Sequence, residues 1–169
     1  MATGARALGH LFNVLPVFVP TDAVAGAITG LRVSMKDCQT VSFVLIAAAG
    51  STDILDIDLQ EHTAFSGGTS RDLDITTKLY YMDEATLDGD EVWTLFSQSA
   101  ASESTDIGSA SAQQLVVVEV GAEQLSDDAF YVSINVPDLG TNGTKFVSCV
   151  AIKTGLYAGR LPTAIAAQS

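Results

Sequence analysis

The chain has 169 residues, which suits one domain of ordinary size, and its net charge of −12 without any basic cluster excludes binding to a phosphate backbone through cationic contacts. Apolar residues make up 47 % and charged residues 17 %, so either the fold has sheets covered on both faces or other proteins bury part of its surface. No membrane span is expected, because the longest apolar stretch, 41–49, is much shorter than the roughly 20 residues that a spanning helix needs. Polar residues and a proline interrupt the apolar stretch 8–19, so we do not expect a signal peptide.

Residues 1–29 form the first predicted unit, an extended N-terminal arm. The segment is apolar, but Pro16 and Pro20 disfavour both a long helix and a central strand. We expect the arm to pack on its own domain or to reach a neighbouring subunit, and a short helix over 5–14 is the alternative. Its large apolar side chains are the candidate assembly interface: Leu11, Phe12, Val14, Leu15, Val17 and Phe18.

Residues 30–153 form the second unit, which is predicted to be an all-β domain. Apolar and polar residues alternate in several short segments, for example in 55–60, and this pattern is typical of half-buried strands. The segments 41–48 and 115–120 are almost continuously apolar, which indicates strands that are buried on both faces. The predicted strands are 31–36, 41–48, 55–60, 73–81, 91–97, 115–120, 130–136 and 146–153.

Eight short strands without a long helix between them favour a jelly-roll-like antiparallel β-sandwich, in which two four-stranded sheets pack together. A Greek-key sandwich with a different connectivity is the main alternative. Asn142 and Gly143 predict a hairpin turn, the serine-rich stretch 97–114 predicts a long loop, and 122–127 predicts one helical turn. Residues 154–169 are predicted to be a C-terminal tail that lies over the surface or on a neighbour.

The best candidate for a metal site is an acidic cluster between two predicted strands. Hard cations such as calcium require several oxygen ligands at fixed separations, which loops can supply. The acids do not recur at the alternate positions of an EF-hand loop, and Gly89 lies between two of them in a predicted tight turn. We therefore interpret the cluster as a solvated turn and predict no metal and no other cofactor. Its members are Asp83, Glu84, Asp88, Asp90 and Glu91.

The sequence contains no recognisable catalytic constellation, so we predict that the chain is not an enzyme and assign no catalytic residue. The two histidines, His10 and His62, lie far apart, no Gly-x-Ser-x-Gly motif is present, and His62 is expected at the surface or in a loop. Cys38 and Cys149 lie at apolar, strand-like runs and are interpreted as buried free thiols, although a disulfide between them stays open.

Two further features have both a structural and a functional interpretation. Asp56 and Asp58 alternate with apolar residues, so we interpret them as charges on the outer face of a strand rather than as the paired carboxylates of a glycosidase. Trp93 is interpreted as a core residue of a strand. The alternative is a sugar-binding platform that Trp93 forms with Tyr80 or Tyr81.

The region 30–152 resembles small proteins encoded with the head genes of tailed bacteriophages, and the segments that carry the resemblance across the chain are 8–14, 59–63, 67–70, 84–93 and 123–127. The resemblance implies a structural virion protein that decorates or cements the head by binding the capsid lattice. The implied partners are the major capsid protein and other copies of the chain, as a homotrimer or alternatively a dimer. The implied location is the outer surface of the capsid, after assembly in the cytoplasm of the bacterial host.

Two other functions are kept as alternatives. The first alternative is a different structural part of a virion, such as a tail-tube or head-fibre protein. The second is a carbohydrate-binding β-sandwich module that uses Trp93. Neither nucleic acid nor a membrane is expected as a partner, because the chain is acidic and lacks a spanning segment.

Overall fold

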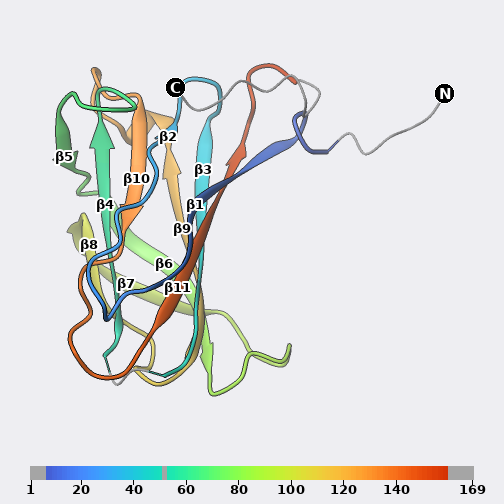
Figure 1. The fold of residues 1–169 in the computed structure, drawn as a ribbon. Coiled ribbons are helices and arrows are strands. Elements are labelled where there is room, and N and C mark those ends of the chain that lie inside the picture. Colours follow the sequence, from blue (N-terminus) through green and yellow to red (C-terminus); the bar gives the residue numbers. More distant parts are fainter. Residues whose placement is uncertain (1–6, 51–52, 160–169) are drawn as a thin grey trace.

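The computed structural model describes residues 7–50 and 53–159, which form two antiparallel β-sheets packed face to face (Figure 1). The larger sheet has six strands in the order β1 (Phe12–Asp22), β11 (Phe146–Thr154), β3 (Thr40–Ala47), β9 (Gln113–Gly121), β6 (Thr76–Glu84) and β7 (Thr94–Ala101). The smaller sheet has the order β2 (Val33–Ser34), β10 (Tyr131–Asn135) and β4 (Leu55–His62). Two strands, β5 (Ser70–Asp72) and β8 (Glu103–Ile107), pair with different stretches of β4.

The strand pairing has the nested order of a jelly roll. The first strand pairs with the last, β1 with β11, and the pairs β2–β10, β3–β9 and β4–β5 follow inside it. The strands β6 to β8 are inserted between β5 and β9, and β6 and β7 widen the larger sheet beyond β9. The predicted jelly-roll-like antiparallel sandwich is confirmed, with eleven strands in the described ranges rather than about eight.

Helical structure is confined, in the described ranges, to one 3-10 turn at Ala122–Gln124, within the stretch where one helical turn was predicted. None of these residues forms a helix with the length and hydropathy of a membrane span.

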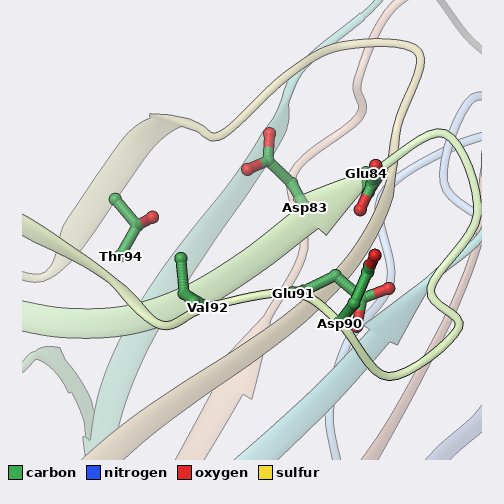
Figure 2. A pocket seen from close by; sticks show the side chains of 6 residues that line it. All are labelled: Asp83, Glu84, Asp90, Glu91, Val92 and Thr94. Carbon is green, nitrogen blue, oxygen red and sulfur yellow. The ribbon is translucent and has the colours of Figure 1, made fainter.

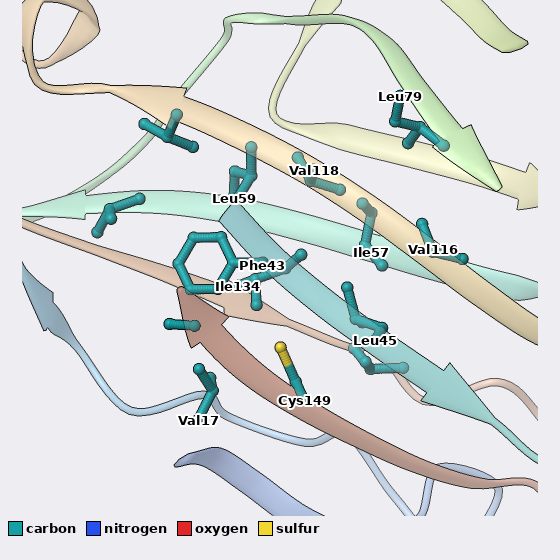
Figure 3. Close-up of a cluster of buried hydrophobic side chains, with 14 of the residues drawn as sticks. Val17, Phe43, Leu45, Ile57, Leu59, Leu79, Val116, Val118, Ile134 and Cys149 are labelled. Atoms are coloured by element: carbon teal, nitrogen blue, oxygen red, sulfur yellow. The ribbon is translucent and has the colours of Figure 1, made fainter. Parts of the chain in front are cut away.

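The core lies between the sheets, where the inward-pointing residues of each strand meet. Burial alternates residue by residue along β3, so Val41, Phe43 and Leu45 point inward. They belong to one cluster with Ile57 of β4 and Ile134 of β10 (Figure 3). Burying a side chain of this size stabilises the fold by about 1.5–3 kcal/mol. This shared core joins the two sheets into one folded unit.

The described part of the predicted arm belongs to the larger sheet. Phe12–Asp22 is β1, which pairs along β11, and Val17 is buried in the core. As an edge strand, β1 accommodates Pro16 and Pro20, and its register shifts on both sides of Phe18. No helix forms over residues 7–14, the described part of the alternative helix. Contact of this segment with a neighbouring subunit stays a prediction.

A close contact at Gly30 fixes the segment between β1 and β2. A Cβ atom at this position would lie 2.0 Å from the carbonyl oxygen of Ile134 and 2.9 Å from Val17 Cγ1, so only glycine fits. The N–H of Gly30 also donates to Asn135 Oδ1 at 3.0 Å. The segment that leaves the larger sheet is therefore held directly against β10 of the smaller sheet.

Two local predictions are wrong. Asn142 and Gly143 do not form a hairpin, because the flanking strands β10 and β11 lie in different sheets and the chain crosses between them here. The serine-rich stretch 97–114 is not a loop, because it contains most of β7, all of β8 and the start of β9. Pairing with the edge of β4 supports β8 despite its polar sequence, and Ser104 is fully buried there. Of the predicted tail 154–169, residues 160–169 lie outside the described residues.

Candidate functional site

The solvent-facing side of the six-stranded sheet, here called the apolar outer face, carries a row of apolar residues that crosses all six strands. The row follows directly from the strand registers, in which each residue is paired with the next one across the sheet. Its members, in strand order, are Pro16, Val150, Val44, Val117, Tyr80 and Leu95. Cross-strand neighbours on one face lie within about 4.5–5.5 Å of each other, so the row is a continuous surface.

Adjacent rows extend this surface. Ile46 pairs with Leu115, which pairs with Met82, and Ile46 is 54 % exposed. Phe146 of β11 is 50 % exposed, and Val14 of β1 pairs with Ile152. An antiparallel sheet that faces water normally carries polar side chains on its outer side. A face with this composition is typical of a surface that other protein covers.

Charges on the apolar outer face lie near its margins. The outward positions of the sheet strands include Lys78 and Glu84 near opposite ends of β6, and Glu119 toward the end of β9. Glu119 accepts a hydrogen bond from Ser42 Oγ at 3.2 Å. The row through Val44 and Val117 therefore contains no charge, and Glu119 lies one outward position beyond Val117 on β9.

Tyr80 and Trp93 line a shallow hollow of about 350 Å³ on this face, together with Val117 and Glu119. The prediction that Trp93 is a core residue is wrong, because its side chain is 48 % exposed. Trp93 precedes β7 and does not belong to the regular strand that was predicted over 91–97. The structure thus brings Trp93 to the same hollow as Tyr80, whereas Tyr81 packs against the core.

The six candidate interface residues of the N-terminal segment divide into two groups. Phe12 and Val14 pair with the outward positions of β11 and lie on the apolar outer face, and Leu11 is 71 % exposed just before β1. The other three serve the protein's own interior: Val17 is buried, and Leu15 and Phe18 pack against the core. The larger part of the face comes from β3, β9 and β11, and the apolar runs of β3 and β9 were predicted to be buried on both faces.

The outer face of the smaller sheet is polar. Asp56, Asp58 and Gln60 of β4 alternate with buried residues and point outward, as predicted for the two aspartates. Asp58 accepts a hydrogen bond from Asn135 Nδ2 at 3.1 Å, and Asp56 accepts the N–H of Asp106 at 2.7 Å. Partial burial raises the pKa of Asp56, although the hydrogen bond from Asp106 opposes that effect.

His62 is not the surface or loop residue that the sequence indicated, because it is only 3 % exposed at the end of β4. Its Nδ1 lies 2.8 Å from Ser70 Oγ and its Nε2 lies 2.8 Å from Ser133 Oγ. Arg32 covers the site by donating to Ser70 Oγ and to nearby carbonyl oxygens. Burial and the Arg32 charge lower the pKa of His62 to about 4, so the ring is neutral and fully engaged in structure.

The acidic cluster occupies the hairpin that connects β6 and β7 (Figure 2). The carboxylates of Glu84, Asp90 and Glu91 lie within 4.8 Å of one another, close enough to share a cation. Hydrogen bonds from its own backbone N–H and from those of Asp88 and Gly89, the latter two at 2.5 and 3.0 Å, lower the pKa of Glu91. Repulsion from Asp90 raises the pKa of Glu84. The cluster lies in an exposed turn, and its interpretation as a solvated turn without a metal stays a prediction.

The two cysteines are buried free thiols, as the sequence indicated. Burial raises the pKa of Cys38 to about 11 and that of Cys149 to about 12. Since the thiolate is the reactive form, both side chains are inert packing groups at neutral pH.

Comparison with known proteins gives only a distant structural likeness. No family model matches the sequence, and no curated protein matches it significantly. The chain is similar to a chain of the VP2 subviral particle of infectious bursal disease virus, with a TM-score of 0.26, 12 % identity, and coverage of 93 % of this chain and 44 % of the other. For the structure of the Gx strain of the same virus, the TM-score is 0.25 at 11 % identity, with 86 % and 40 % covered. The chain thus spans less than half of the length of these chains, and similarity at this level does not indicate what it binds.

Proposed function

We propose that this chain is a structural virion protein of a tailed bacteriophage that decorates the head and stabilises the capsid lattice. The observation that carries the proposal is the apolar outer face, which crosses six strands and is left uncovered by the described residues. An apolar surface of this extent is costly to leave in water and favours a protein that works inside an assembly. The resemblance to proteins encoded with phage head genes supplies the particular assembly.

The chemistry of the chain supports a structural rather than an enzymatic role. Both ring nitrogens of His62 are engaged by serine hydroxyls in a buried site, and the thiols of Cys38 and Cys149 are held in their unreactive form. The polar outer face of the smaller sheet supplies an acidic surface that keeps the protein soluble. In this role the partner is the major capsid protein, and the location is the outer surface of the capsid.

Binding to empty heads tests this function directly. Purified protein is mixed with empty heads of the phage that encodes it and pelleted, and the bound fraction is measured against protein concentration. We expect saturable binding with a fixed number of copies per head, together with a higher melting temperature of the decorated heads. Protein that stays in the supernatant at every concentration would exclude the decoration role, and binding only to tails would favour a tail protein.

Carbohydrate binding is a second candidate function, because Tyr80 and Trp93 are half-exposed and line the same hollow beside the Glu119 carboxylate. Aromatic faces next to a hydrogen-bonding group are suited to stacking on sugar rings. A glycan array with wild-type and Trp93→Ala protein tests it. Sugar binding that the Trp93→Ala substitution abolishes would support this function, and an array without any signal would remove it.

A further inference from the structure

The apolar outer face needs a partner of matching size and chemistry, and the face itself restricts the choice. A partner with a basic surface would find its electrostatic match on the acidic outer face of the smaller sheet, at Asp56 and Asp58, rather than on the apolar outer face, where Glu119 is the one carboxylate among the described residues beside the central row. The partner must therefore present a broad apolar surface. A second copy of the chain offers such a surface with the same width and the same arrangement of rows.

The extent of the face suits pairing with a copy of itself. Six strands and three outward positions per strand, of which two rows are mainly apolar and the third carries Ser42 and Glu119, correspond to roughly 29 Å by 20 Å, so two copies would bury on the order of 1,200 Å² in total. This area is at the lower end of the range for specific, stable interfaces. Two sheet faces also pack with their strands about 30° apart, by the same rule that packs the inner faces of this sandwich.

We propose that two copies of this chain pair through their apolar outer faces, sheet against sheet, in a two-fold symmetric dimer. In such a contact the same residues face each other, so each face is completely covered by its partner. Three copies around one axis cannot all lay this face against the same face of a neighbour. The geometry therefore favours a dimer over the homotrimer that the resemblance implied.

Val44 and Val117 identify where the dimer axis passes. They are paired neighbours on β3 and β9, the third and fourth strands of six, so they lie at the centre of the apolar row. With complete overlap of the two faces, the axis passes close to this pair. Each copy of Val44 then lies near the Val44 or Val117 of its partner, whereas Gln60 on the other sheet lies far from any contact.

Sedimentation velocity of the isolated full-length protein over a concentration series tests the dimer. We expect a monomer–dimer equilibrium, and we expect Val150→Arg to raise the dimer Kd by at least about 100-fold, because the substitution buries an unpaired charge on both copies. Gln60→Arg, on the polar outer face, should leave the Kd unchanged. Circular dichroism checks that both variants are folded. A monomer at all concentrations, a dimer insensitive to Val150→Arg, or a trimer would overturn the proposal.

Salt dependence and cross-linking provide independent readouts. Each copy carries a net charge of −12, so added salt should screen repulsion and strengthen the dimer, whereas a contact made by opposite charges would weaken. Val44→Cys, alone or mixed with Val117→Cys protein, should give a disulfide-linked dimer on a non-reducing gel, and Gln60→Cys should not, since the native cysteines are buried. Weakening by salt, or equal cross-linking of the two variants, would contradict the pairing.

This inference deepens the proposed assembly role and rests on it for its biological meaning, but its experiments use the isolated chain. If the dimer forms and heads do not bind it, the decoration role fails and the pairing stands. If a monomer binds heads, the pairing fails and the decoration role stands. If both hold, the apolar outer face joins the two copies and another surface of the dimer meets the capsid. Paired copies then bind two lattice sites, so Val150→Arg should also weaken head binding through lost avidity.

Discussion

The two outer faces of this sandwich differ in chemistry, although they cover the same core. Outward positions on β3 are occupied by Val44 and Ile46, whereas those on β4 are occupied by Asp56, Asp58 and Gln60. The inner positions of both strands are similarly apolar and buried. The difference shows that the hydropathy of a strand reports two environments at once, the core on one side and the surroundings of the face on the other. A continuously apolar strand therefore has an apolar outer side as well as an apolar inner side, and in this chain that outer side is the surface that we propose a second copy covers.

The largest expected effect separates the two sides of one strand. Phe43→Ala should destabilise the protein by about 3–5 kcal/mol, because it leaves a cavity in the core, whereas Val44→Ala should cost less than about 1 kcal/mol in the monomer. Urea unfolding at low protein concentration measures both. At high concentration the cost of Val44→Ala should increase if the apolar outer face is buried in a dimer. Equal costs for the two substitutions would contradict the assignment of faces.

Acid should lower the free energy of unfolding of the protein through His62, which lies in the smaller, polar-faced sheet. The pKa of the folded histidine is about 4 and that of the unfolded one is 6.5, so only the unfolded chain takes up this proton between these pH values. The contribution of His62 to the free energy of unfolding is constant above pH 6.5. It falls by about 2–3 kcal/mol as the pH decreases toward 4. Unfolding free energies at pH 7 and pH 4.5 measure the change.

Two histidine variants sharpen this measurement. His62→Gln keeps a hydrogen-bonding side chain but cannot take up the proton, so the loss between pH 6.5 and pH 4 should become smaller than in the wild type. His10→Gln, a substitution of an exposed histidine, is the matched control and should keep the wild-type pH dependence. An unchanged pH dependence in His62→Gln would show that other groups cause the acid sensitivity.

A smaller effect is expected where Glu61 is held beneath the loop that follows the 3-10 turn. Its carboxylate accepts the Ser126 hydroxyl at 2.6 Å and Arg71 Nε at 2.9 Å. Burial raises the pKa of Glu61, but the hydrogen bonds from Ser126 and Arg71 together lower it below its usual value. Ser126→Ala should cost about 1 kcal/mol at neutral pH.

The pH dependence provides the check on Ser126→Ala. The pKa of Glu61 is lower in the folded protein than in the unfolded chain, where it is 4.5. The charged carboxylate therefore stabilises the fold above pH 4.5, and this stabilisation is lost as the pH falls through the pKa of the folded state. Thermal unfolding at pH 7 and pH 3 measures this, and the difference between variant and wild type should shrink at pH 3. Ser109→Ala, in the turn before β9, provides a serine control. A difference that is equal at both pH values would indicate that Ser126 acts without Glu61.

The smallest effect belongs to the acidic hairpin at the margin of the apolar outer face. Its carboxylates repel Glu84 and raise the folded pKa of that residue, so the charged form opposes folding at neutral pH and this repulsion is relieved as the pH falls. Glu84→Gln should slightly raise the melting temperature at pH 7, less so in high salt and not at pH 4. Differential scanning calorimetry detects the shift, and a lower melting temperature would mean that the cluster binds a stabilising cation.

Strand pattern was enough to predict the sandwich, because alternation and apolar runs follow directly from burial between two sheets. The segment of β1 was predicted to be an arm, because two prolines disfavour a central strand. An edge strand tolerates them, and β1 lies at the edge of the larger sheet. The strand β8 was missed, because its pairing with β4 replaces the apolar side chains that mark most strands. Sequence alone also placed Trp93 in the core. Which side of a strand an aromatic residue takes depends on register, and register is fixed by pairing partners distant in the sequence.

The candidate surface was predictable only in part, because composition indicated surplus apolar residues but not their position. The sequence directed attention to the N-terminal segment, where Val17 and Phe18 serve the core and only part of the segment contributes to the outer face. The missing information was the order β1-β11-β3-β9-β6-β7, which aligns residues from six separate segments into one row.

The inserted strands β6 and β7 have a consequence for how such a surface can evolve. The nested pairs of the jelly roll form without β6 and β7, which extend the larger sheet beyond β9, and Leu79 of β6 also packs in the core. Lengthening or shortening β7, the edge strand, would thus change the width of the outer face and leave the nested strand pairs in place. Changes at this edge strand would therefore alter the surface that contacts neighbouring molecules, while the rest of the domain is inherited unchanged.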